Sequence, residues 1–197
     1  MSKNVVICSS AGLGKTLMTI VVLFALHRRN RQDRFIVVCP SSLVQNWKAE
    51  FNKWLGRASQ PHRVVIEGIV EPHIQAFCQL KPNKSEILIL SYEMVRSKNV
   101  LKHLSQAKQL GCMVLDEGHR LKSESTQILT ALLSIDVKSK ILISGTPIQN
   151  NLAEFYRLCD FVNPGILGNL SSFRQGKSCL NHYGNVSLFN APQFVFY

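Results

Sequence analysis

The feature that most constrains the fold is a regular alternation of short apolar runs with longer segments of helical character. Runs rich in β-branched residues stand at residues 5–8, 35–39, 64–66, 87–90, 112–115 and 141–143. They are nearly continuous in apolar residues, as is typical of parallel strands covered on both faces. The segments between them are long enough for crossover helices. The pattern therefore predicts an α/β fold with a doubly wound, mostly parallel sheet flanked by helices.

Serines mark two of the expected helix starts. Ser41 and Ser42 precede a segment that contains Trp47 and Trp54, and Ser123 precedes a second segment with helical apolar spacing. The two tryptophans are seven residues apart and so share one face of the expected helix. We interpret both as packing residues, the alternative being platforms on which bases stack.

The composition of the chain indicates which class of binding partner is favoured. A chain of 197 residues with 46% hydrophobic residues is expected to fold as one substantial domain. Its 23 Lys and Arg residues exceed its 12 Asp and Glu residues, which leaves a net charge of +11 and favours an acidic partner, nucleic acid before membrane. No apolar stretch approaches the ~20 residues that a bilayer span needs. We expect neither secretion nor membrane insertion. The basic cluster at residues 27–31 is interpreted as a solvated helix end, the alternative being a nuclear-localisation or DNA-binding patch.

The cysteines indicate a reduced, intracellular protein. The chain has six cysteines with no CxxC pair, so we interpret them as core residues, with zinc or disulfide bonds as the alternatives.

The composition changes after Arg174. Residues 175–197 contain no Asp or Glu and one Lys, and their aromatic residues follow no helical or strand period. We expect one domain at residues 1–174, clipped at its N-terminal end, followed by a divergent tail at 175–197. The tail is either a loop with one edge strand at 193–197 or, as we favour, a departure from a longer domain plan that leaves an apolar end exposed.

A glycine-rich segment follows the first expected strand and opens the first expected helix. In Gly12-Leu13-Gly14-Lys15-Thr16, the glycines let backbone N–H groups close around a phosphate and Lys15 reaches the β/γ oxygens. The Thr16 hydroxyl is suited to Mg²⁺. These residues predict a phosphate-binding loop, although Ser9 stands where the full consensus has its first glycine. An ordinary glycine turn that caps a helix is the alternative.

Two adjacent acids end another apolar strand about 100 residues later. Asp116 can hold Mg²⁺ through water, and Glu117 can orient or deprotonate the attacking water. The carboxyl ends of parallel strands are where α/β ligands bind. With the Lys15 loop in the same chain, a catalytic pair is favoured over a solvated turn. A third strand ends in Ser144-Gly145-Thr146, which is either a plain turn or a segment that hydrogen-bonds the acidic pair and reports the state of the γ-phosphate.

The motifs resemble, in order, those of one family. The stretches 12–16, 39–47, 90–93, 116–122 and 144–150 are similar to the first motor lobe of Swi/Snf-type helicase-like ATPases of superfamily two. The stretches 48–56 and 161–168 resemble the recombination-repair branch, the Rad-fifty-four-like translocases, and most of all its B-type members. The resemblance covers about residues 5–174.

The resemblance implies a RecA-like P-loop NTPase lobe that works as a nuclear, ATP-driven motor on double-stranded DNA. It further implies action on complexes of the strand-exchange recombinase in recombination and repair, without strand separation. Carried over by position, Gly12 to Thr16 bind ATP, Thr16 and Asp116 hold Mg²⁺, and Asp116 and Glu117 are the hydrolytic acids. His119 and Ser144 to Thr146 form the coupling motif. Ser41, Ser42 and Asn46 contact the DNA phosphate backbone without reading base sequence.

The chain departs from the family pattern in two places. It has Ser9-Ser10-Ala11 where the family has an acidic pair and a Met, and the upstream adenine-recognition segment has no counterpart. Nothing corresponds to the second motor lobe, which in the family supplies the arginine finger. We therefore expect a DNA-dependent ATPase by family that turns over little on its own. The alternative is a catalytically incompetent fragment that binds nucleotide or a partner and has a regulatory role or none.

Overall fold

The computed structural model describes residues 4–8, 12–30, 33–55, 62–65, 71–79, 86–118, 126–145 and 152–174. Ser9 to Ala11, Ser123, His119 and Thr146, all singled out above, lie outside the described residues, as does the segment 175–197.

In the described residues, six strands form one sheet in which every neighbouring pair is parallel. The strands are β1 (Val5–Cys8), β2 (Arg34–Cys39), β3 (His62–Val65), β4 (Glu86–Ser91), β5 (Leu110–Leu115) and β6 (Lys140–Ser144). Their order across the sheet is β1-β6-β5-β2-β4-β3. The predicted parallel α/β fold is confirmed, and each apolar run overlaps a strand, although residue 66 of the third run lies outside the described residues.

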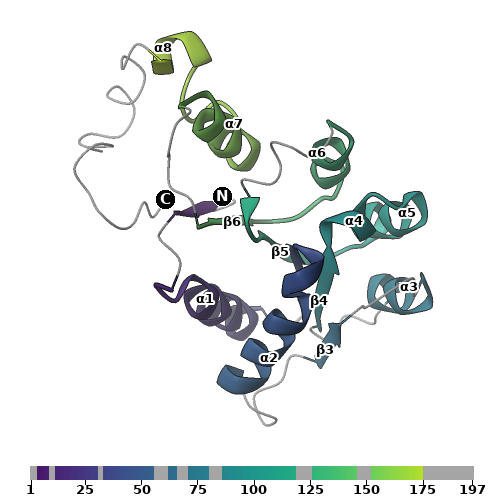
Figure 1. Ribbon diagram of the computed structural model, residues 1–197. Coiled ribbons are helices and arrows are strands. Elements are labelled where there is room, and N and C mark those ends of the chain that lie inside the picture. Colours follow the sequence, from purple (N-terminus) through teal and green to yellow (C-terminus); the bar gives the residue numbers. More distant parts are fainter. Residues whose placement is uncertain are drawn as a thin grey trace.

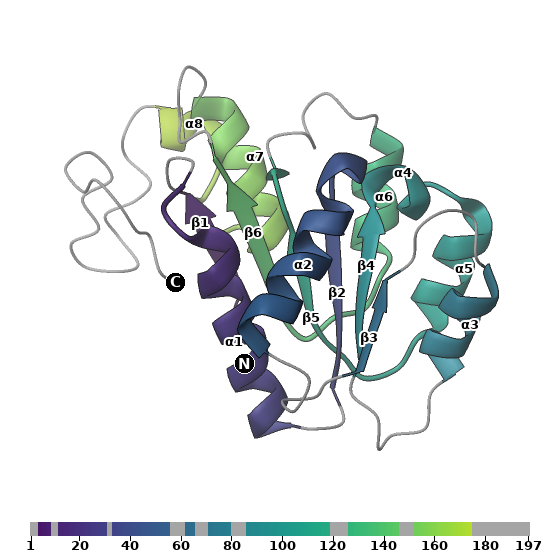
Figure 2. The same ribbon diagram turned by 60° about the horizontal axis from the view of Figure 1, so that its bottom comes forward.

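Helices cover both faces of this sheet (Figure 1). They are α1 (Lys15–Arg29), α2 (Val44–Leu55), α3 (Glu71–Gln79), α4 (Tyr92–Val95), α5 (Lys98–Gln106), α6 (Thr126–Leu133), α7 (Leu152–Val162) and α8 (Leu170–Arg174). Helices α1 and α2 lie on the face turned toward the reader in Figure 2, and α3 to α7 lie on the other. A 3-10 turn, η1 (Ser41–Leu43), connects β2 to α2, so the serines expected at the start of this helix lie in the turn that leads into it.

Two apolar layers, one on each face, explain why the strand runs are continuous in apolar residues. Along β2, Phe35 and Val37 pack toward α1 and α2, whereas Ile36 and Val38 pack toward the opposite helices. All four side chains are completely buried. Both faces of the central strands are therefore core, which leaves no position for a solvated residue.

The packing interpretation is confirmed for Trp47 and wrong for Trp54. The Trp47 ring is fully buried and lies 5.7 Å from the Phe51 ring, centroid to centroid. Trp54 is 46% exposed because, in the last turn of α2, it contacts its own helix instead of the sheet. Its indole N–H donates to Glu50, and the Lys53 ammonium lies 4.8 Å from its ring centroid.

The described cysteines follow the core interpretation. Cys39, Cys112 and Cys159 are buried free thiols, and Cys78 is half-buried and free. Burial raises the pKa of Cys39 and of Cys112 to about 12 in each case. These thiols are therefore protonated and unreactive at neutral pH.

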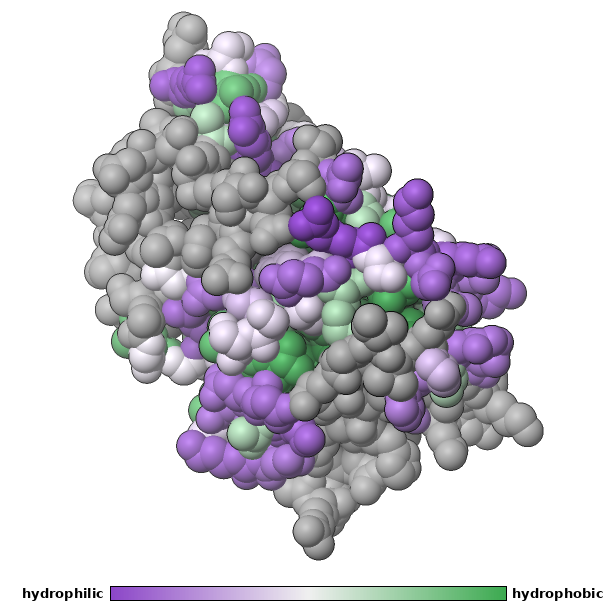
Figure 3. All heavy atoms as spheres, turned by 45° about the vertical axis from the view of Figure 1, so that its right-hand side comes forward, coloured by the Kyte–Doolittle hydropathy of each residue, from purple (hydrophilic) through white to green (hydrophobic). Residues whose placement is uncertain are grey.

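The described surface is largely hydrophilic on the side shown in Figure 3, where hydrophobic side chains reach the surface only in small areas. Among the described residues, the large apolar side chains that are exposed are Leu13, Val21, Val22, Trp54 and Leu133. Within the described ranges, none of the helices has the length and apolar character that crossing a membrane requires.

Candidate nucleotide site

The segments singled out by sequence come together at the carboxyl edge of the sheet. Strand β6 lies between β1 and β5, with Cys8 paired to Ser144 and Leu115 paired to Leu142. The loops that follow these three neighbouring strands therefore leave the sheet at the same edge, where parallel α/β folds bind ligands. The expected phosphate-binding loop follows β1, the acidic pair follows β5, and Gly145 follows β6.

The glycines of the expected phosphate-binding loop have the backbone conformation that such a loop needs. Gly12 and Gly14 have φ angles of +84° and +77°, which disfavour any residue with a Cβ. A Cβ atom added at either would meet nothing within 4 Å, so space for a ligand lies over the backbone. Gly14 caps α1, and Lys15 and Thr16 are the first two helical residues. The N-terminal dipole of a 15-residue helix thus faces this space, and no acidic residue stands in the first turn to oppose an anion.

Asp116 is held by hydrogen bonds to both of its carboxylate oxygens. Trp47 Nε1 donates to Oδ2 at 2.7 Å, and the backbone N–H of Glu117 donates to Oδ1 at 2.9 Å. Tyr92 Oη donates to the Asp116 carbonyl oxygen at 2.8 Å. Burial raises the pKa of Asp116, and the hydrogen bond from Trp47 opposes that rise. Sequence reasoning missed Trp47 and Tyr92 as residues of this site, because the contacts join segments that lie 69 and 24 residues apart.

Glu117 points to a different place from Asp116. Its φ of 52° lies in the left-handed region, which turns the backbone sharply after β5. The Gly145 N–H donates to Glu117 Oε2 at 3.3 Å. A Cβ atom added at Gly145 would lie 3.4 Å from Glu117 Oε1 and 3.8 Å from Lys15 Nζ. Lys15 of the expected phosphate-binding loop and Glu117 of the acidic pair therefore converge on Gly145.

A backbone donor next to β6 contacts the acidic pair. Ser144 is buried at the end of β6, and the N–H of the next residue, Gly145, donates to Glu117.

The residues expected to contact DNA lie further along the same edge. Ser41 and Ser42 form the start of η1 and Asn46 lies in the first turn of α2, and all three are exposed. They follow the carboxyl end of β2, the strand next to β5. The expected nucleotide residues and the expected DNA residues thus occupy neighbouring stretches of one edge.

The residues expected to bind a metal offer oxygen atoms, the kind of ligand that Mg²⁺ prefers. Within the described ranges, no group of three or more His, Cys, Asp or Glu side chains is placed to hold a metal ion. Mg²⁺ is usually bound by one or two side-chain oxygens together with waters and substrate phosphates, so it does not need such a group. The Thr16 hydroxyl at the start of α1 and the Asp116 carboxylate fit that mode.

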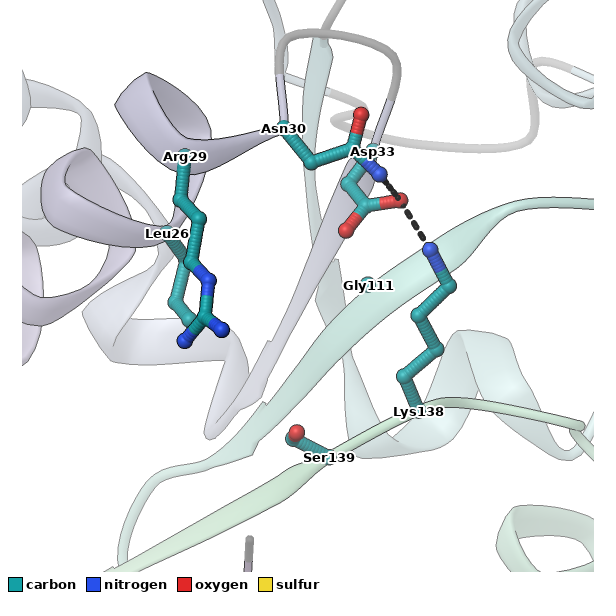
Figure 4. A pocket seen from close by; sticks show the side chains of 7 residues that line it. All are labelled: Leu26, Arg29, Asn30, Asp33, Gly111, Lys138 and Ser139. Atoms are coloured by element: carbon teal, nitrogen blue, oxygen red, sulfur yellow. Dashed lines mark hydrogen bonds and ion pairs between the residues drawn. The ribbon is translucent and has the colours of Figure 1, made fainter. Parts of the chain in front are cut away.

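A pocket of about 600 Å³ lies at the opposite, amino edge of the sheet, near the starts of β2, β5 and β6. In Figure 4, Asn30 and Lys138 both point toward the Asp33 carboxylate. They contact its Oδ1 at 2.9 and 2.5 Å. The polar groups at the centre of this pocket satisfy one another, and none of the expected site residues lines it.

Comparisons with known proteins show the family to which the chain belongs. The model of the SNF2-related domain matches residues 1–185. The human DNA repair and recombination protein RAD54B is 40% identical over 179 residues, which cover 86% of this chain and 18% of that protein. The human DNA repair and recombination protein RAD54-like is 38% identical, over 88% of this chain and 24% of that protein.

A solved structure shares the fold. The Sulfolobus solfataricus SWI2/SNF2 ATPase core in complex with double-stranded DNA superposes with a TM-score of 0.70 and 26% sequence identity. The match covers 88% of this chain and 34% of that one. The chain thus spans about a fifth of the length of its curated relatives and about a third of the solved ATPase core.

Proposed function

The chain belongs to the SNF2-related domain family, and from this premise we propose that it is the ATP-binding first motor lobe of a double-stranded-DNA translocase. The proposal places the lobe in homologous recombination and DNA repair, the processes named for its RAD54B and RAD54-like relatives. The human relatives are named as DNA repair and recombination proteins, which supports the nucleus as the proposed location. The strand-exchange recombinase is the proposed protein partner.

One observation carries the proposal for ATP. Gly145, which follows β6, lies close to both the Glu117 carboxylate and the Lys15 ammonium. A cation for phosphate oxygens, a carboxylate for a water molecule and a backbone donor that links them to the next loop are thus gathered in one place. An ordinary glycine turn that only caps α1 does not account for this convergence.

Each residue has a distinct part in the proposed mechanism. The backbone N–H groups of the glycine loop and Lys15 bind the β- and γ-phosphates, and the Thr16 hydroxyl and Asp116 carboxylate would hold Mg²⁺. When bound, Mg²⁺ would neutralise charge on the phosphate oxygens. Glu117 orients the attacking water and accepts its proton. Gly145 donates to Glu117, so the position of the loop after β6 controls whether that carboxylate is aligned.

The proposed DNA contacts use the backbone of the duplex. Ser41, Ser42 and Asn46 are exposed polar residues at the start of α2, where hydroxyl, amide and N–H donors suit phosphate oxygens. Such contacts orient a protein on the duplex and carry no base information. The SWI2/SNF2 core that shares this fold was solved with double-stranded DNA, which supports the choice of duplex over single strands.

The test is ATP affinity in two lysine variants. Lys15→Ala removes the proposed phosphate contact, whereas Lys102→Ala removes an exposed lysine of α5, a helix that packs at the far side of the sheet. Because a charge-assisted hydrogen bond contributes about 1.5 to 3 kcal/mol, ATP affinity is expected to fall about 10- to 100-fold in Lys15→Ala and to stay unchanged in Lys102→Ala. Calorimetric titration measures both, and thermal unfolding checks that each variant folds. Unchanged affinity in folded Lys15→Ala contradicts the proposal.

A further inference from the structure

Trp47 is a buried aromatic residue with a polar atom that reaches the proposed site. Its side chain is completely buried, and its Nε1–H donates to Asp116 Oδ2 at 2.7 Å. A buried indole N–H needs an acceptor, and many acceptors would serve. Here the acceptor is the carboxylate that the proposed function assigns to Mg²⁺.

The hydrogen bonds around Asp116 fix the orientation of its carboxylate. Oδ1 accepts from the backbone N–H of Glu117, its immediate neighbour, while Oδ2 accepts from Trp47 on a different element. Tyr92 and Val38 hold the Asp116 backbone, through its carbonyl oxygen and its N–H at 2.8 Å each. A carboxylate has about four lone-pair directions, so two hydrogen bonds leave room for a metal ion or its waters. The hydrogen bond from Trp47 is therefore the one that fixes the plane of the Asp116 carboxylate from a different element of the fold.

Trp47 also connects Asp116 to the proposed DNA surface. It follows Asn46 in α2, and the η1 turn with Ser41 and Ser42 leads directly into this helix. Asn46 is exposed and Trp47 is buried. The same turn of α2 therefore presents Asn46 to solvent and Trp47 to Asp116. A displacement of the start of α2 moves the indole relative to the carboxylate.

Trp54 provides an internal comparison for this interpretation. It lies in the same helix and its Nε1 also donates to a carboxylate oxygen, Glu50 Oε2, at the same distance of 2.7 Å. That carboxylate belongs to α2 itself and lies on the surface of the helix, away from the acidic pair. The two indoles therefore make the same kind of hydrogen bond in two different places.

We propose that Trp47 is a positioning residue that holds the Asp116 carboxylate in the orientation required for Mg²⁺ and links it to the DNA-facing start of α2. This inference rests on the proposed function, because it assigns a role toward the metal that accompanies ATP. It concerns a residue that does not itself touch nucleotide, metal or DNA.

The first test compares Trp47→Phe with Trp54→Phe. Each change removes one indole N–H and keeps an aromatic ring. ATP affinity is measured by calorimetry with and without Mg²⁺, with circular dichroism to check folding. We expect Trp47→Phe to bind ATP without Mg²⁺ as tightly as the wild-type chain does. The increase in ATP affinity that Mg²⁺ produces is expected to be about 10- to 100-fold smaller in this variant, which is the usual effect of removing a hydrogen-bond partner of a metal ligand. Trp54→Phe is expected to keep the full gain.

The second test is spectroscopic and does not need Trp47→Phe to fold. The chain has two tryptophans, so Trp54→Phe leaves Trp47 as the sole indole reporter. Its emission is expected to shift when Mg²⁺ is added with ATP, and again when a short DNA duplex is added. No shift on addition of Mg²⁺ and ATP overturns the positioning role, and a shift with them but none with duplex overturns the link to the DNA surface.

The outcomes separate this inference from the function it rests on. If the wild-type chain binds ATP more tightly with Mg²⁺ and folded Trp47→Phe does the same to the same extent, the positioning role is wrong and the proposed function stands. If the wild-type chain gains nothing from Mg²⁺, the proposed function fails and the inference fails with it.

Discussion

At the scale of single residues, the chain separates two neighbouring carboxylates by a local distortion of the backbone. Glu117 adopts a φ of 52°, a conformation that costs a residue other than glycine about 1 to 3 kcal/mol. The turn directs Glu117 toward Gly145 while Asp116 stays with Trp47. Strain of this kind persists where the surroundings hold it, and it is concentrated at functional sites. It gives two adjacent acids two different environments.

Gly118 makes this turn possible by its lack of a side chain. A Cβ atom added there would lie 2.7 Å from Cγ of Leu142 and within 2.9 Å of both its methyl carbons. Leu142 is completely buried in β6 and has little freedom to move. We therefore expect Gly118→Ala to lower the free energy of unfolding by about 1 to 3 kcal/mol, the usual cost of overpacking. Urea denaturation measures this change.

A double-mutant cycle identifies the cause of that loss. In a Leu142→Ala background the added methyl group has space, so the further cost of Gly118→Ala is expected to be smaller than in the wild-type background. Equal costs in the two backgrounds would show that the loss arises from the backbone at Gly118 and not from the contact with Leu142.

At the scale of elements, the sequence predicts which segments are strands much better than it predicts which strands are neighbours. Continuous β-branched runs predict buried parallel strands because both faces of β2 and β5 are core. The order β1-β6-β5-β2-β4-β3 depends on where each crossover helix returns, and no local pattern encodes this.

The candidate site also has a part that local sequence patterns predict and a part that depends on which strands are neighbours. Lys15, Asp116 and Glu117 stand in local motifs whose residue types suit the proposed phosphate and metal chemistry, so the sequence alone can suggest them. The bond from Trp47 to Asp116 requires that β2, which leads to α2, lies beside β5. Trp47 and Trp54 are seven residues apart and therefore share one face of α2. Periodicity alone assigns both to packing, although Trp54 is exposed.

The central strands also predict how stability depends on pH. Burial raises the pKa of Cys112 in β5 to about 12, above its ordinary value of 9.0. The unfolded thiol ionises first, so stability is fully present below pH 9 and is lost as the pH rises from 9 toward 12. The free energy of unfolding, measured by urea denaturation, is expected to be lower at about pH 10.5 than at about pH 7.5. This thiol contributes on the order of 2 kcal/mol to that decrease.

Cys112→Ala is the control for this effect. Removing a buried side chain lowers stability at every pH, so the relevant quantity is the difference between the two pH values. That difference is expected to be smaller in Cys112→Ala than in the wild-type chain. An identical difference in both would mean that other groups cause the alkaline loss.

At the scale of the whole molecule, the carboxyl edge of the sheet has two adjoining parts. The loops after β1, β6 and β5 carry the proposed nucleotide residues, and the turn after β2 carries the proposed DNA residues. Strands β5 and β2 are neighbours, so the boundary between the two parts falls at the Trp47–Asp116 hydrogen bond. This short separation is what the proposed link between the two parts needs in order to act without a large rearrangement.

The charge of the whole chain predicts the character of its DNA binding. With a net charge of +11 and proposed contacts to phosphates alone, binding to duplex DNA is expected to be independent of base sequence. Each neutralised phosphate releases counterions, so two such contacts already lower the affinity about tenfold between 50 and 200 mM salt. Fluorescence anisotropy with two duplexes of unrelated sequence, across that salt range, measures both properties. A sequence-selective footprint, or an affinity that does not change with salt, contradicts this prediction.

Two serine variants locate the DNA surface on the molecule. Ser42→Glu puts a negative charge where the start of α2 is proposed to meet a phosphate, so it is expected to weaken duplex binding about tenfold or more. Ser105→Glu puts the same charge on the exposed surface of α5, beside the opposite layer of the core, and lowers the net charge by the same amount. If binding depended on overall charge alone, the two variants would lose affinity equally. A loss confined to Ser42→Glu, together with unchanged thermal unfolding of both variants, is the result that a phosphate contact at this turn requires.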